Sequence, residues 1–81
     1  MEEYYLDGKL HRVNGPAVDS ANGYKAWYIG GKLSRRNGPA VIMPNKTMLW
    51  YLSGKLHRIG GPAVISPYGQ QEYWEKGNRI R

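Results

Sequence analysis

Short stretches in which apolar and polar residues alternate recur along the whole chain, each closed by a turn-forming pair. Trp27-Tyr28-Ile29 and Leu49-Trp50-Tyr51-Leu52 are rich in the aromatic and branched side chains that favour strands. Two-residue turns are predicted directly after such stretches at four places, which are Asp7-Gly8, Gly30-Gly31, Ser53-Gly54 and Lys76-Gly77. Each stretch with its turn therefore predicts a β-hairpin.

The pattern repeats with a step of 23 residues and without an insertion. Gly8, Gly31, Gly54 and Gly77 keep this step, and the run Gly15-Pro16-Ala17-Val18 recurs beginning at Gly38 and again at Gly61. Even spacing of this kind indicates one supersecondary unit stacked on itself. The fold class predicted is all-β: an antiparallel meander of about seven strands, built from three and a half 23-residue repeats in a single domain over residues 1–81.

Within each predicted hairpin, the two-residue turn fixes the register. It pairs Tyr28 with Leu33 and Trp27 with Ser34, and in the next copy Tyr51 with Leu56. The recurring Asn-Gly-Pro should interrupt the returning strand as a bulge or bend, because proline removes a ladder donor. A second turn closes each unit, at Ala21-Asn22-Gly23, Pro44-Asn45-Lys46 and Pro67-Tyr68-Gly69. Strand alternation sends the two neighbouring aromatic positions to opposite faces.

The residue pattern Trp-Tyr-x-x-Gly-Lys-Leu-His-Arg-x-x-Gly-Pro-Ala-Val resembles the MORN-like repeats of small proteins from tailed phages and large DNA viruses. It is more distantly similar to MORN repeats, which build a single-layer sheet of successive hairpins. The resemblance covers the whole chain and implies a small protein that disarms a host defence, such as an inhibitor of a toxin or nuclease in the host cytoplasm. MORN repeats also imply binding of anionic lipid headgroups, although Gly-Pro-Ala-Val departs from their ordinary pattern.

The charge is unevenly distributed along the chain. The formal net charge is +6, yet no carboxylate occurs between Ser20 and Gln71. Such a one-sign field attracts phosphate backbones or acidic proteins. The absence of cysteine excludes disulfides and thiolate metal sites, and fits a reducing compartment such as the cytoplasm.

Recurring cations and aromatic residues make up the candidate binding surface. Equivalent side chains should lie about 9–10 Å apart along the stack, which would produce a positive stripe beside an aromatic ladder. The candidate residues for binding nucleic acid or a protein partner are Lys9, His11, Arg12, Lys32, Arg35, Arg36, Lys55, His57, Arg58, Tyr28 and Tyr51. The alternative is that the aromatic ladders hold the sheet together and the cations form a solvated rim.

A catalytic role is not expected. His11 and His57 could in principle act as acid and base, but two repeats separate them by about 20 Å on the strand spacing. No metal, cofactor or small-molecule substrate is predicted, since the histidines and carboxylates form no ligand cluster in the sequence.

The leading hypothesis from sequence is a non-enzymatic protein that binds RNA or single-stranded nucleic acid. A protein–protein inhibitor or adaptor that docks on an acidic partner is the first alternative, and binding to an anionic membrane surface is the second. Pairing of two copies through open sheet edges, giving a homodimer, stays open at this stage.

Overall fold

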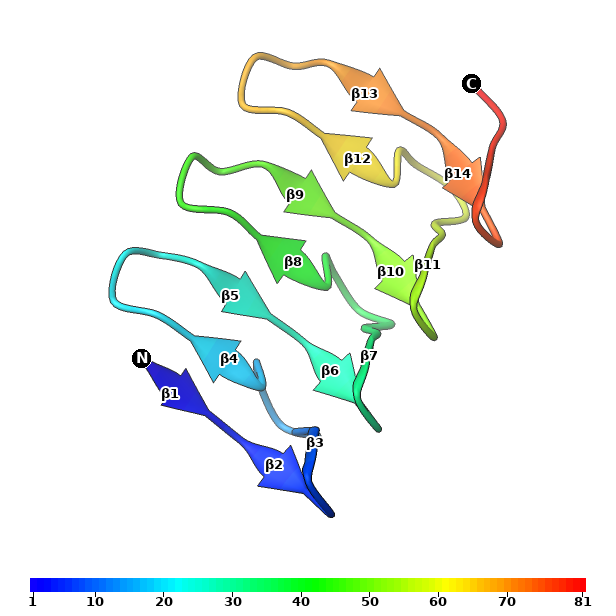
Figure 1. Cartoon of the computed structure of the whole chain (residues 1–81). Helices are drawn as coiled ribbons and strands as arrows, with labels where there is room; N and C mark the ends of the chain where they lie inside the picture. The colour runs from blue at the N-terminus through cyan, green and yellow to red at the C-terminus, as the bar shows by residue number, and fades with distance from the viewer.

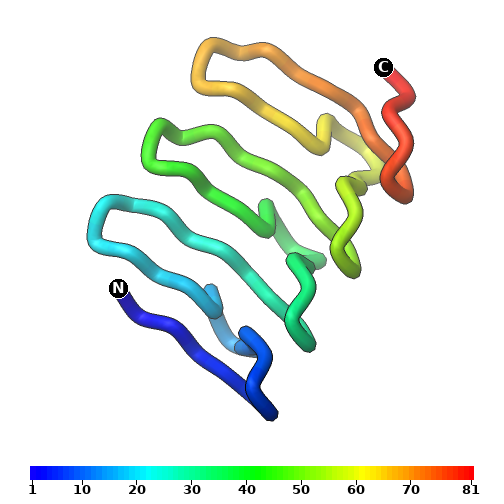
Figure 2. The backbone as a smooth tube through the Cα atoms, in the orientation of Figure 1, coloured from blue at the N-terminus to red at the C-terminus, as the bar shows by residue number.

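The computed structural model describes all residues from 1 to 81 and contains strands, turns and bends but no helix. The predicted all-β meander is confirmed, with hairpins that recur at the sequence period (Figure 1). The backbone follows the same path in each copy, and the copies are stacked side by side (Figure 2). The molecule measures 36 × 26 × 16 Å, so it is a thin, elongated slab.

Seven two-residue strands form the main antiparallel sheet. In spatial order they are β1 (Glu2–Glu3), β4 (Val18–Asp19), β5 (Lys25–Ala26), β8 (Val41–Ile42), β9 (Met48–Leu49), β12 (Val64–Ile65) and β13 (Gln71–Glu72). Ala26 lies opposite both Val18 and Val41, which places three small apolar side chains in one row.

Four hairpins flank this sheet along one side, one for each copy. They are β2–β3 (Tyr5–Leu6 and Lys9–Leu10), β6–β7 (Tyr28–Ile29 and Lys32–Leu33), β10–β11 (Tyr51–Leu52 and Lys55–Leu56) and β14–β15 (Trp74–Glu75 and Asn78–Arg79). The aromatic strand expected over 27–29 is therefore two strands, β5 and β6, which are separated at Trp27. The interruption predicted in the returning strand from Lys32 toward Met43 is confirmed, because a bend at Asn37-Gly38 separates β7 from β8.

The predicted hairpin register is confirmed. Tyr28 pairs with Leu33 and Tyr51 pairs with Leu56. Trp27 accepts a hydrogen bond of 3.0 Å from the amide of Ser34, as the predicted Trp27–Ser34 pair requires. Both turn residues have positive φ in all four hairpins, as in Gly30 (58°) and Gly31 (84°), which is the type I′ geometry that suits twisted strands.

Successive hairpins are joined to each other by backbone hydrogen bonds. The amide of Gly31 donates to the carbonyl of Leu10 at 2.9 Å, and the amide of Arg12 donates to the carbonyl of Tyr28 at 3.1 Å. The same pair of bonds recurs at the two later junctions. Two sets of backbone hydrogen bonds thus join the copies, one within the main sheet and one between successive hairpins.

Small residues form the buried core. The alanines of the three Gly-Pro-Ala-Val runs (Ala17, Ala40 and Ala63) are completely buried, as is Ala26, and no large side chain is fully buried. The amide of Trp27 donates to the carbonyl of Ala40 at 2.7 Å, which brings the backbone of the returning segment against the aromatic position. Small side chains are needed here because the two segments lie so close together.

Candidate binding surface

Each Gly-Pro segment begins with an arginine that lies over the aromatic residue eight positions earlier in the sequence. The Cζ atom of Arg35 is 3.9 Å from the centroid of the Trp27 ring, and Arg58 lies 4.0 Å from the Trp50 ring. Arg12 over Tyr4 and Arg81 over Tyr73 repeat the contact. These distances are those of cation–π pairs, which attract a guanidinium to the face of an aromatic ring.

Each of the first three guanidinium groups also lies against the glycine of its own loop. A Cβ atom added to Gly38 would lie 2.9 Å from Cζ of Arg35, so a larger residue at this position would displace the guanidinium. Arg35 also donates from Nη1 to the carbonyl of Pro39 at 3.0 Å. Burial lowers the pKa of the Arg35 guanidinium, because desolvation penalises the charged form. Arg12 and Arg58 make the equivalent bonds to Pro16 and Pro62.

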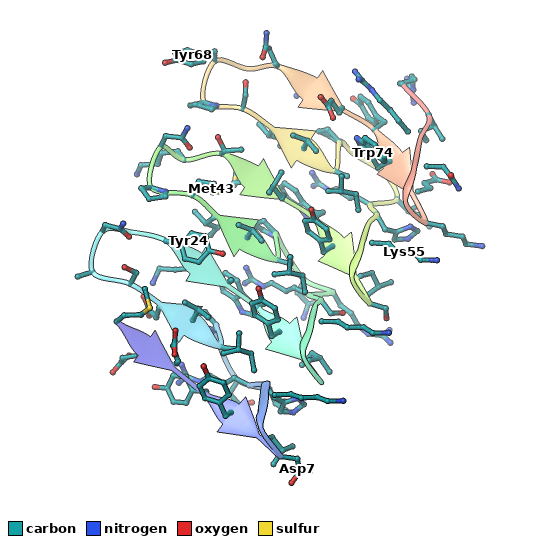
Figure 3. All side chains as sticks on the ribbon, in the orientation of Figure 1. Asp7, Tyr24, Met43, Lys55, Tyr68 and Trp74 are labelled. Atoms are coloured by element: carbon teal, nitrogen blue, oxygen red, sulfur yellow. The ribbon has the colours of Figure 1, made fainter.

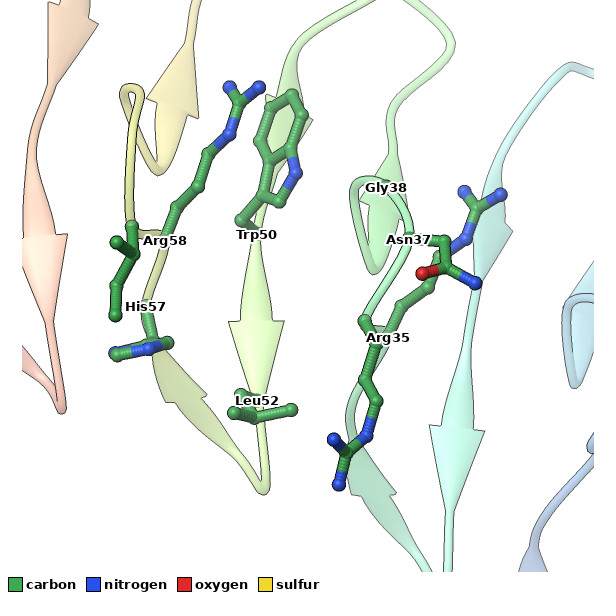
Figure 4. Close-up of a pocket in the computed structure, with 9 residues that line it drawn as sticks. Arg35, Asn37, Gly38, Trp50, Leu52, His57 and Arg58 are labelled. Carbon is green, nitrogen blue, oxygen red and sulfur yellow. The ribbon is translucent and has the colours of Figure 1, made fainter.

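Two open grooves lie between successive copies on the face that carries the tryptophans. The first, about 770 Å³, contains Trp27 and Ile29 between the loops of copies one and two. The second, about 510 Å³, contains Trp50 and Leu52 between the loops of copies two and three. In Figure 4, Trp50 and Leu52 lie between the segment with His57 and Arg58 and the loop that carries Arg35 and Asn37.

The loop of the second copy is the wall shared by both grooves. Arg35, Arg36, Asn37 and Leu52 line the two grooves together, whereas no carboxylate lines either of them. Arg36 is exposed and makes no ion pair or side-chain hydrogen bond. The outer walls carry Val13 and Ile59, the residues equivalent to Arg36, and each is 76% exposed. A cation therefore lies between two exposed aliphatic side chains.

The candidate lysines lie away from the grooves, at the ends of the hairpins. Lys9, Lys32 and Lys55 are exposed, and Lys55 projects from its hairpin end in Figure 3. The carbons of Lys9 lie 3.4 Å from the position that a Cβ on Gly31 would take, so the lysine stem covers the next turn. Lys32 and Lys55 cover the turns that follow them in the same way. Their alkyl chains therefore pack while their ammonium groups stay in water.

The structure contains only two ion pairs. Lys25 lies 3.3 Å from Asp19, and Arg79 lies 3.9 Å from Glu72. None of the candidate cations takes part in either, so their charges are not neutralised within the chain.

The two histidines accept hydrogen bonds from the next copy. Nδ1 of His11 accepts from the amide of Gly30 at 2.9 Å, and Nδ1 of His57 accepts from the amide of Lys76 at the same distance. Ser34 takes this role in the middle copy, with its Oγ accepting from Ser53 at 3.1 Å. His57 lines the second groove, while His11 lines neither.

The candidate tyrosines lie on the face opposite the grooves. Tyr28 pairs with Leu33, whereas Ile29, which lines the first groove, pairs with Lys32. Neighbouring residues on a strand point to opposite faces, and therefore Tyr28 and Tyr51 are separated from the lysines. Tyr24 lies beside Tyr28 on that face, and both its burial and Tyr28 raise the pKa of its hydroxyl.

The predicted residues thus fall into three places. Arg12, Arg35, Arg36, Arg58 and His57 are brought together at the grooves, the lysines lie at the hairpin ends, and the tyrosines lie on the other face.

Sequence reasoning did not identify the groove walls at Val13 and Ile59, or the groove tryptophans as partners of arginine. The sequence does carry a signal for the contacts between arginine and aromatic residues. The aromatic residue, the arginine and the glycine recur together at positions such as 27, 35 and 38.

No group of three or more histidine or carboxylate side chains is placed to hold a metal ion, and no helix suited to crossing a membrane is present. Comparisons with known protein families, curated proteins and solved structures found no match to this chain.

Proposed function

We propose that this chain is a non-catalytic binding protein whose grooved face docks on an acidic segment of a protein partner. The observation that carries the proposal is the composition of the two grooves. Arginines and tryptophans line them, aliphatic side chains flank them, and carboxylates are absent. Arginine and aromatic residues are enriched in protein interfaces, where they combine apolar contact with directed hydrogen bonds.

A protein partner fits this surface better than single-stranded nucleic acid does. Stacking of bases needs open aromatic faces next to cations. Arg35 covers one face of the Trp27 ring and Arg58 one face of the Trp50 ring, so any ligand meets only the remaining surface of these two rings. The tyrosine row is on the side away from the arginines and lysines. Exposed Val13 and Ile59 give no advantage against a phosphate backbone, but they would bury apolar area against a protein.

The histidines support a non-catalytic role. Each uses Nδ1 to hold the next turn in place, and serine replaces histidine at the same junction in the middle copy. Because serine makes the same bond, the hydrogen bond alone accounts for the histidine at this junction.

The resemblance to MORN-like phage proteins suggests the setting of this interaction. In that setting the partner would be an acidic host defence protein in the cytoplasm, and the chain would inhibit it by occupying its surface. Single-stranded nucleic acid is the second candidate ligand, favoured by the uninterrupted positive charge between Ser20 and Gln71.

The test is capture of partners from a host lysate with and without nuclease, using two charge-reversal variants. Arg36→Glu changes the shared groove wall, and Lys46→Glu makes the same charge change at an exposed turn that lines neither groove. We expect to capture a protein that contains an acidic segment. Its capture should persist after nuclease treatment and should be lost with Arg36→Glu but not with Lys46→Glu. Capture that nuclease abolishes, with affinity falling linearly against the logarithm of salt concentration, would support nucleic acid instead.

A membrane-surface role is tested in the same series by sedimentation with anionic and neutral vesicles. Binding to anionic vesicles that both variants weaken equally would point to a diffuse charge effect and contradict the groove as the docking site.

A further inference from the structure

The two grooves are equivalent sites spaced by one repeat. Trp27 lines one and Trp50 lines the other, and these residues hold the same position in successive copies. Each copy adds two strands to the main sheet, so the spacing between equivalent positions is about 9.4–9.8 Å. The 36 Å length of the slab agrees with three and a half units of that size. A ligand that fills both grooves must therefore present matching groups about 9.5 Å apart.

The spacing discriminates between backbone conformations of a bound segment. A polyproline II helix rises about 3.1 Å per residue with three residues per turn, so every third residue returns to the same face after about 9.3 Å. An extended strand also covers roughly 10 Å in three residues, but its alternation turns the third residue to the opposite side. Only the polyproline II segment keeps both groups directed at the grooves.

We propose that the grooved face binds an acidic polyproline II segment, with apolar residues, prolines best, at every third position. One such residue would contact Trp27 and the next Trp50, while a carboxylate between them reaches Arg36 on the shared wall. This inference rests on the proposed function and narrows it to one class of partner. Aromatic-lined grooves are a known means of binding this conformation, since its preformed backbone loses little entropy on docking.

Arg36 is the arginine best placed to bind the carboxylate of the ligand. Arg12, Arg35 and Arg58 each contact an aromatic ring and the glycine of their loop, and each already donates to a proline carbonyl. Arg36 is exposed, unpaired and lines both grooves. Its planar fork can take a carboxylate in a bidentate pair, which a lysine cannot do.

The indoles keep surface available to such a ligand. Trp27 and Trp50 are only partly buried, although arginine covers one face of each ring. Ile29 and Leu52 extend the apolar floor of the grooves beside them. Proline rings that pack on this floor would be held between the arginine-bearing loops.

The experiment measures binding of fluorescein-labelled peptides by anisotropy, with tryptophan emission as a second readout. The main probe has four Pro-Glu-Pro units, and the comparison probes have four Gly-Glu-Gly or four Pro-Lys-Pro units. The glycine probe keeps the charge and removes the polyproline II preference, and the lysine probe reverses the charge. Arg36→Ala and Lys46→Ala provide matched losses of one unpaired cation.

We expect the Pro-Glu-Pro probe to bind at least tenfold more tightly than either comparison probe. Its affinity should fall at least tenfold with Arg36→Ala and stay within twofold with Lys46→Ala. Equal affinity for the Pro-Glu-Pro and Gly-Glu-Gly probes would overturn the conformational inference and leave an acidic partner as the proposed function. Binding of oligouridylate without binding of any acidic peptide would overturn both.

Discussion

Replacing Arg35 with alanine should destabilise the protein far more than replacing its neighbour Arg36. Arg35 has its guanidinium 3.9 Å from the Trp27 ring centroid and donates to the Pro39 carbonyl at 3.0 Å. A partly desolvated cation–π contact contributes about 1 kcal/mol. A hydrogen bond from a charged donor contributes roughly 1.5–3 kcal/mol. Together these contacts give an expected loss of about 3 kcal/mol.

For a domain of this size, a loss of about 3 kcal/mol corresponds to a decrease in Tm of roughly 12–24 °C. Arg36→Ala removes the same charge one residue later, but this side chain makes no ion pair or hydrogen bond. Its effect should stay within about 0.5 kcal/mol, as for other exposed positions. Arg35→Lys keeps the charge and loses the planar stack, so its stability should fall between the two.

The assay is urea unfolding followed by circular dichroism, with Tm from a thermal scan of the same variants. Similar midpoints for Arg35→Ala and Arg36→Ala would refute the assignment of Arg35 to the fold. A loss of less than about 1 kcal/mol for Arg35→Ala would do the same, because it is smaller than the charged hydrogen bond alone.

Three further changes test other features of the structure. Lys46 has φ of 77° in a turn where two other copies have glycine, so Lys46→Gly should raise the free energy of unfolding measured in urea by about 0.5–1 kcal/mol, whereas Lys46→Ala should not raise it. His57→Ser should retain stability, since Ser34 makes the equivalent bond, and His57→Ala should lose about 1 kcal/mol in the same measurement; equal losses would contradict the acceptor role. Burial and Tyr28 raise the pKa of Tyr24 above 10, so the unfolded chain loses this proton first and stability falls as pH rises through about 10 and beyond. Tyr24→Phe should reduce that alkaline loss, measured as the difference in urea midpoint between neutral and alkaline buffer; an unchanged difference would exclude this tyrosine as a source.

Features set by local sequence could be predicted well. The pairs Tyr28–Leu33 and Tyr51–Leu56 follow from the length of the turn, and the type I′ geometry follows from glycine in the second turn position. The stacking of copies follows from a period that no insertion breaks. These properties depend on neighbours within a few residues or on the repeat itself.

The arrangement around Arg35 could not be predicted in the same way. It depends on the break between β5 and β6 at Trp27 and on the path of the loop that returns to Ala40. Contacts between such segments are set by tertiary geometry, which spacing along a strand does not specify. The separation of Tyr28 from Lys32, by contrast, follows from strand alternation. The sequence alone was therefore enough to assign the candidate tyrosines and lysines to different faces.

The identical backbone bonds at each junction have a consequence for how this protein can change length. A copy inserted or removed as a whole would meet the same donors and acceptors on either side, so the remainder would need no new contacts. The number of grooves would then rise or fall by one on the same backbone frame, and the wall residue at the position of Arg36, Val13 or Ile59 would set the chemistry of each. The length of the docking face therefore changes only by whole repeats, and a duplication within the coding sequence could lengthen it in a single step.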